Sequence, residues 1–191
     1  MSIPTPNPTD EIMQALRTGL GPFLAENDPL RRILINAQAG EREALPVVAV
    51  ELEDVAAGTW QQGLKLVGWR FLAVDADGNG IVVNVTTPKG HPPRVAGVQR
   101  GPHVAKTIQA VRAVQTPPDA AGVDVELVFL NIPGLLTETF WIRPKAHGDG
   151  WAVPYRTLID DLKSKPVYTL ADFFNQSKSL AENRLQQDDG I

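Results

Sequence analysis

The chain has 191 residues and a formal net charge of −4, and 43% of its residues are hydrophobic and 21% charged. This balance is typical of globular proteins and excludes disorder of the whole chain. Cysteine is absent, which excludes disulfides, thiol catalysis and thiolate metal sites. No segment is apolar over the thickness of a bilayer and the first residues lack a signal-peptide pattern, so we predict a soluble, cytoplasmic protein without membrane contact.

Two short amphipathic helices are predicted near the N-terminus. Residues 1–8, with prolines at positions 4, 6 and 8, are predicted to form a flexible lead. Thr9 is a suitable N-cap, and apolar residues then recur at helical spacing until glycines and a proline interrupt the pattern. Asp28 followed by Pro29 is typical of a second helix start, because proline at the first helical position sacrifices no hydrogen bond.

From residue 45 the apolar pattern changes to the alternation of β-strands. The stretch 45–55, LPVVAVELEDV, places Val48, Val50 and Leu52 on one face and predicts a half-exposed strand. The stretch 64–74, LKLVGWRFLAV, is apolar on both faces and predicts a central strand that is covered on both sides. Four further strands are predicted at 81–87, 123–131, 136–143 and 151–156.

Two segments in the second half of the chain have helical character. Residues 101–115 fit either a helix or a strand, and Gly101 followed by Pro102 favours a helix start. A C-terminal helix is predicted over 170–186, because a capping box and a hydrophobic staple precede its apolar face. The residues that form these two motifs are Thr169 with Asp172, and Tyr168 with Phe173.

The fold class that follows is α+β, with a mostly antiparallel sheet of about six strands, two N-terminal helices and a C-terminal helix. We predict a single domain over 9–186 and a frayed tail at 187–191. Trp60 stands outside any clear pattern, so we interpret it as a surface anchor. Four other aromatic residues lie within strand patterns and are predicted to lie in the core: Trp69, Phe71, Phe140 and Trp141.

The stretch 75–80, DADGNG, matches the beginning of a calcium-binding EF-hand loop. Such a loop needs a glutamate at position 12 and a helix on each side, but position 12 counted from Asp75 is Thr86 and both flanks alternate like strands. Asp-Gly and Asn-Gly between strands are typical of hairpin turns. We therefore predict a turn, with a weak cation site at Asp75, Asp77 and Asn79 as the alternative.

Four catalytic templates are missing from the sequence: the G-x-S-x-G elbow, the H-E-x-x-H pair, the Walker loop and a G-x-G-x-x-G helix start. The stretch 147–153, HGDGWAV, is predicted to be a second hairpin, and Asp160-Asp161 a solvated turn. No metal site and no cofactor are predicted. Each histidine is isolated in its local sequence, at positions 91, 103 and 147.

Charge is unevenly distributed along the chain. Residues 78–118 contain five Lys and Arg residues and no Asp or Glu, within an acidic protein. The part 86–106 is rich in Gly and Pro and is predicted to be a long loop, a kind of segment that often carries function. It offers a partner or an anion five candidate contacts: Lys89, Arg94, Arg100, His103 and Lys106. We favour the other interpretation, that these cations pair with carboxylates of the same protein, because pairing of surface charges is common.

The sequence favours a non-catalytic binding or assembly module that acts through protein–protein interaction or self-association. The alternative is an enzyme that acts on a small anionic substrate in a cleft near the basic 89–106 loop, with Lys89, Arg100 and His103 converging there. The acidic net charge argues against nucleic acid as the partner.

Overall fold

The computed structural model describes residues 6–36, 42–114, 117–146, 149–157, 162 and 166–188. Within these residues it is an α+β fold with six α-helices: α1 (Asp10–Gly19), α2 (Pro29–Asn36), α3 (Leu52–Ala56), α4 (Trp60–Gly63), α5 (Pro102–Ala113) and α6 (Leu170–Asp188). Two short 3-10 helices, η1 (Pro118–Ala120) and η2 (Pro133–Leu135), flank a strand. None of the described helices combines the length and apolar character needed to cross a bilayer.

The described strands form one mixed sheet of eight, in the order β4-β3-β2-β1-β5-β6-β7-β8. Their bounds are β1 (Arg42–Ala49), β2 (Lys65–Val74), β3 (Gly80–Thr86), β4 (Arg94–Arg100), β5 (Val125–Ile132), β6 (Thr137–Pro144), β7 (Trp151–Arg156) and β8 (Tyr168–Thr169). The sheet is therefore larger than the predicted six strands and is not purely antiparallel, because β1 and β5 run parallel.

The chain forms two compact units, which we describe separately. The described residues of unit 1 fall within Val47–Leu66 and Gln115–Ile191, and those of unit 2 within Thr5–Pro46 and Val67–Val114. A single domain over 9–186 stays a prediction. Helix α6 continues to Asp188, two residues beyond its predicted end.

In unit 1 the parallel pair joins Val47 to Phe129, and β5, β6, β7 and β8 follow as antiparallel neighbours. The strand predicted over 45–55 is wrong in its second half, because β1 ends at Ala49 and Leu52 begins α3. Leu52 and Val55 are both buried. Their spacing of three fits one face of a helix, a periodicity that the alternation of the preceding valines concealed.

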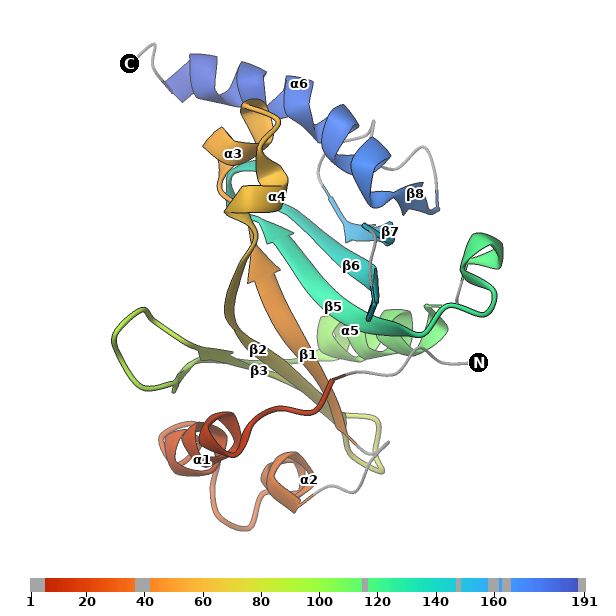
Figure 1. The fold of residues 1–191 in the computed structure, drawn as a ribbon. Helices are drawn as coiled ribbons and strands as arrows, with labels where there is room; N and C mark the ends of the chain where they lie inside the picture. The colour runs from red at the N-terminus through yellow and green to blue at the C-terminus, as the bar shows by residue number, and fades with distance from the viewer. Residues whose placement is uncertain are drawn as a thin grey trace. The chain divides into compact units, whose positions relative to one another are not determined.

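Helix α6 covers the core of unit 1 together with α3 and α4 (Figure 1). Its predicted start is confirmed, since the amide of Asp172 donates to Thr169 Oγ1 at 3.1 Å and the rings of Tyr168 and Phe173 meet edge to face. Trp60 is not a surface anchor, because it is buried and stacks on Phe174 with ring centroids 4.2 Å apart. No local pattern signals this contact, which depends on α6.

The predicted hairpin between β6 and β7 is present, with Ile142 opposite Trp151. Asp149 lies at its turn, and its carbonyl accepts a hydrogen bond from Trp141 Nε1 at 2.6 Å. Gly150 has φ 76°, and a Cβ there would lie 2.2 Å from the carbonyl oxygen of Ile142, so this turn requires glycine. The predictions for His147 and for the Asp160-Asp161 turn concern residues outside the described ones.

In unit 2, β2, β3 and β4 form an antiparallel meander. Their apolar face packs against α1 and α2, which lie beside each other (Figure 1). Trp69 and Phe71 are buried as predicted, but Leu66 is 56% exposed, so only the second half of β2 has the covered character expected of a central strand. Helix α5 confirms the helical interpretation of 101–115, with Val104 and Ile108 buried.

We predict that Trp60→Ala destabilises the protein by about 3–5 kcal/mol, the range for removing a large aromatic side chain from a core. The physical reason is the loss of the stack on Phe174 and the cavity left behind. Urea denaturation followed by circular dichroism measures it. The matched control is Phe23→Ala, since Phe23 is 49% exposed and its removal should change the free energy of unfolding by less than about 1 kcal/mol. Equal losses for both variants would contradict the prediction.

Candidate functional site

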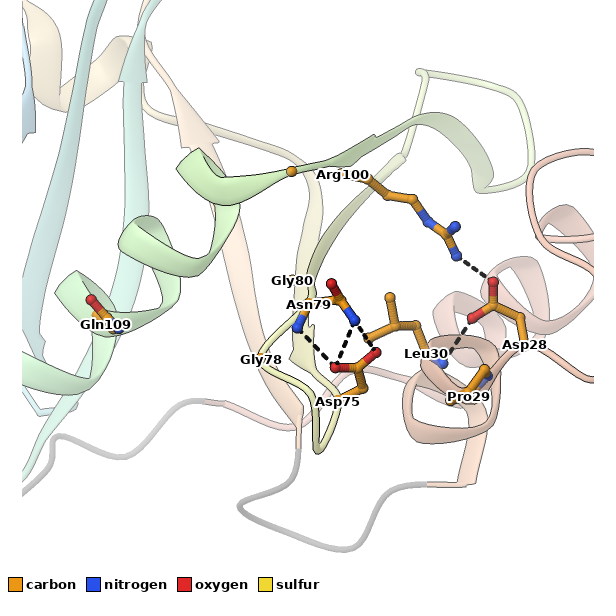
Figure 2. Close-up of a pocket in the computed structure, with 10 residues that line it drawn as sticks. Asp28, Pro29, Leu30, Asp75, Gly78, Asn79, Gly80, Arg100 and Gln109 are labelled. Carbon is orange, nitrogen blue, oxygen red and sulfur yellow. Dashed lines mark hydrogen bonds and ion pairs between the residues drawn. The ribbon is translucent and has the colours of Figure 1, made fainter.

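Unit 2 contains a cavity of about 640 Å³, a size typical of small-molecule sites. Three segments and one residue within α5 form its wall; the segments are the start of α2, the turn between β2 and β3, and the junction of β4 with α5 (Figure 2). The described lining residues are Asp28, Pro29, Leu30, Asp75, Gly78, Asn79, Gly80, Arg100, Gly101 and Gln109. The wall thus combines two carboxylates, one guanidinium and two side-chain amides.

Asp28 ties the start of α2 to the end of β4. Its Oδ1 accepts a hydrogen bond from the amide of Leu30 at 2.9 Å, and its Oδ2 forms an ion pair with Arg100. Burial alone would raise the pKa of Asp28, but the hydrogen bonds from Arg100 and Leu30 and the charge of Arg100 together hold that pKa below its ordinary value of 3.8. Asp28 is therefore ionised at neutral pH.

The turn between β2 and β3 is held by Asp75, which confirms the predicted hairpin. Its carboxylate accepts hydrogen bonds from the amides of Asp77 and Asn79 at 3.0 and 2.8 Å and from Asn79 Nδ2 at 3.2 and 3.0 Å. Gly78 supplies the positive φ of 82°. The hydrogen bond from the Asn79 side chain is the main cause of the lowered pKa of Asp75, and the charge of Arg100 adds to it.

These hydrogen bonds bear on the calcium alternative. They engage both carboxylate oxygens of Asp75, and the flanking elements are the strands β2 and β3 in place of the two helices of an EF-hand. Among the described residues, no group of three or more His, Cys, Asp or Glu side chains is placed to hold a metal ion.

The five cationic candidates do not all occupy the loop predicted over 86–106. That prediction is wrong for 94–100, because these residues form β4, an irregular strand whose bulge at Ala96 hides the alternation of its apolar residues. Arg100 lines the cavity, whereas Arg94 begins the strand, about 20 Å away at the usual rise of about 3.3 Å per residue. Lys89 lies in the connection between β3 and β4.

The described cations among the candidates differ in whether they form an ion pair. Lys89 and Arg94 are exposed and form no ion pair with any described residue. Arg100 pairs with Asp28, as the alternative of internal pairing predicts for that residue. The backbones of His103 and Lys106 lie in α5, and their side chains lie outside the part that the structure describes.

Sequence reasoning did not identify Asp28 or Gln109 as site residues. Asp28 was recognisable as a helix start, but no pattern connects it to Arg100, which lies 72 residues away in the sequence. Gln109 lies on α5 and lines the cavity without any local signal.

We predict that the ion pair of Asp28 with Arg100 stabilises the protein in a pH-dependent way. Asp28→Asn keeps a side-chain oxygen for the Leu30 amide, so at neutral pH it should cost at most about 1 kcal/mol, the value of an exposed ion pair. Because the folded-state pKa is lowered, this contribution is fully present well above pH 3.8 and is lost as the pH falls through the folded-state pKa. Thermal melts at several pH values measure it. The control is Asp28→Ala, which also removes the cap and should therefore stay less stable than the wild type at pH 2. A difference in melting temperature between the wild type and Asp28→Asn that persists at pH 2 would contradict the prediction.

We also predict that calcium binds the DADGNG turn no more tightly than about millimolar, the range of weak calcium modules. The reason is that the turn lacks the glutamate at position 12, where Thr86 stands, and is flanked by strands in place of helices. Calorimetric titration of the whole chain with calcium chloride tests this. The control is Asp77→Asn, which removes one carboxylate of the turn and shows whether any weak binding occurs there or elsewhere on the surface. Submillimolar binding that Asp77→Asn abolishes would contradict the prediction and support the cation site.

Comparison of the chain with models of protein families, with curated proteins and with solved structures finds no match, so the arrangement of the residues themselves carries the functional argument.

Proposed function

We propose that the protein is a non-catalytic binding module that works through protein–protein interaction, and that it takes an extended acidic segment of a partner along β4. The observation that supports this most is that β4 is an edge strand with an arginine at each end. An edge strand presents unpaired N–H and C=O groups that another strand can continue, a common mode of peptide recognition. A cytoplasmic location is part of this proposal.

The edge of β4 has the geometry for strand addition over its second half. Among the described residues β4 pairs with β3 alone, and its register is regular from Gly97, opposite Asn84, to Arg100, opposite Ile81. At the bulge, Ala96 has no partner in β3. Val95 and Val98, three residues apart, thereby both pack towards the core of α1 and α2. The inner face is thus occupied, and the outer edge remains for a partner.

Charge favours an acidic partner over a second copy of the chain. Residues 78–118 have no carboxylate, and Lys89 and Arg94 are exposed without an ion pair among the described residues. Two copies of β4 paired antiparallel about Gly97 would place Arg94 of one opposite Arg100 of the other. Like charges directly opposite in a sheet are destabilising. Self-association through this edge is therefore disfavoured.

The enzyme alternative receives less support from the same geometry. It requires several cations in one cleft, and the described lining of the cavity includes Arg100 but neither Lys89 nor Arg94. A substrate anion there would also meet the carboxylates of Asp28 and Asp75. We therefore keep binding as the proposed function.

The proposal predicts that a synthetic peptide of alternating glutamate and valine binds the protein in a salt-sensitive way, whereas a peptide of alternating lysine and valine does not. Reversing both exposed cations, Lys89→Glu with Arg94→Glu, should weaken binding at least tenfold with little change in melting temperature, because neither residue has an ion pair to lose among the described residues. Fluorescence anisotropy measures the affinity.

The matched control is Arg32→Glu, an exposed arginine of the same unit on α2. It changes the net charge without touching β4 and should reduce the affinity much less. Amide hydrogen exchange of the wild type tests the geometry directly, since bound peptide should slow exchange within 97–100. Equal binding of the two peptides, or unchanged exchange within that range, would refute strand addition at β4.

A further inference from the structure

The cavity of unit 2 contains unused hydrogen-bonding groups of both charge signs. Arg100 uses one Nη for Asp28, and among the described residues its Nε and its other Nη make no hydrogen bond. Among the described residues, Asp75 Oδ2 accepts one hydrogen bond, from Asn79 Nδ2, and the side-chain oxygen of Asn79 accepts none. Donors at one wall and acceptors at another therefore remain for a ligand.

These groups keep their charges over the physiological pH range. Asp28 and Asp75 stay ionised because their hydrogen bonds stabilise the carboxylate form and lower the pKa of each. A ligand with only a negative charge would meet two carboxylates, and one with only a positive charge would meet the guanidinium. A ligand that carries both charges satisfies both walls.

We propose that this cavity binds a small zwitterion with an ammonium and a carboxylate group, of the class of free amino acids. Arg100 receives the carboxylate, and Asp75 with the Asn79 side-chain oxygen receives the ammonium (Figure 2). Gln109 lines the same cavity from α5. Pro29 and Leu30 supply an apolar part of the wall. The site is independent of strand addition at β4, except that Arg100 borders both.

Hydrogen bonds and an ion pair within the protein hold two segments of the cavity wall, the Asp75 turn and the start of α2. The Asp75 turn is closed by backbone and side-chain hydrogen bonds, and the amide of Asp75 donates to the Asn79 carbonyl at 3.0 Å. The start of α2 is held by the Asp28 cap and by the ion pair to Arg100. Such preorganisation lowers the entropic cost of binding.

The test uses the whole wild-type chain, isotopically labelled and titrated with each of the twenty standard amino acids, with nuclear magnetic resonance shifts as the readout. At least one should bind more tightly than about 10 mM, and its shifts should centre on the amides of Asp75, Asn79 and Arg100. The N-acetylated and the amidated forms of that amino acid each lack one charge and should bind at least tenfold more weakly. Binding by neither the twenty probes nor their derivatives, or shifts centred elsewhere, would overturn the proposal.

Variants then separate this site from the β4 edge. Asp75→Asn and Arg100→Gln should each weaken amino-acid binding at least tenfold, whereas Asp77→Asn in the same turn and Arg94→Gln at the far end of β4 should not. Thermal melts show whether each variant is folded. If a variant is unfolded, the positions of the shift changes in the wild-type protein test the site instead. If the wild-type protein binds an amino acid but not the acidic peptide, the proposed function is contradicted and this inference stands. If it binds the acidic peptide but no amino acid, this inference is contradicted and the proposed function stands.

Discussion

The parallel pairing of β1 with β5 requires a long connection between these two strands, and much of the fold lies within that connection. Parallel strands cannot be joined by a tight hairpin, so a long connection separates Ala49 from Val125. That connection supplies α3 and α4 to the core of unit 1, and it also contains β2, β3, β4 and α5 of unit 2. Trp60, whose ring stacks on Phe174 of α6, and the cavity residues Asp75 and Arg100 all lie in this one connection.

Local chemistry explains which parts of the fold could be predicted from the sequence. The turn at Asp75 and the start of α6 at Thr169 depend on hydrogen bonds within a few residues, and both predictions are confirmed. The errors concern contacts distant in the sequence. The local pattern at Leu52 fits a strand and a helix equally well, and only the end of β1 at Ala49 decides for the helix. Trp60 is a core residue because Phe174, far away in the sequence, stacks on it. The pairing of β1 with β5 leaves no local signal at all.

The candidate site was predictable only as a distribution of charge. The absence of carboxylates from 78–118 indicates that Arg94 and Arg100 belong to one basic surface, yet an extended strand holds the two residues far apart. Arg100 forms its ion pair with Asp28. The sequence around Asp28 indicates a helix cap and gives no sign of this ion pair. Residue types can therefore indicate a charged surface, whereas the combination of charges in a cavity depends on which segments the fold brings together.

The division of the chain has a consequence for its folding during synthesis. All described residues of unit 2 precede residue 115, so unit 2 is complete while most of unit 1 has not yet left the ribosome. At about 5–20 residues per second, several seconds pass before Phe174 follows. During that time Val47–Ala49 of β1 lack Phe129–Asn131, their parallel partners, and Trp60 lacks Phe174. The nascent chain thus contains every described residue of unit 2 together with apolar segments of unit 1 that still lack their partners, and these segments need protection from aggregation.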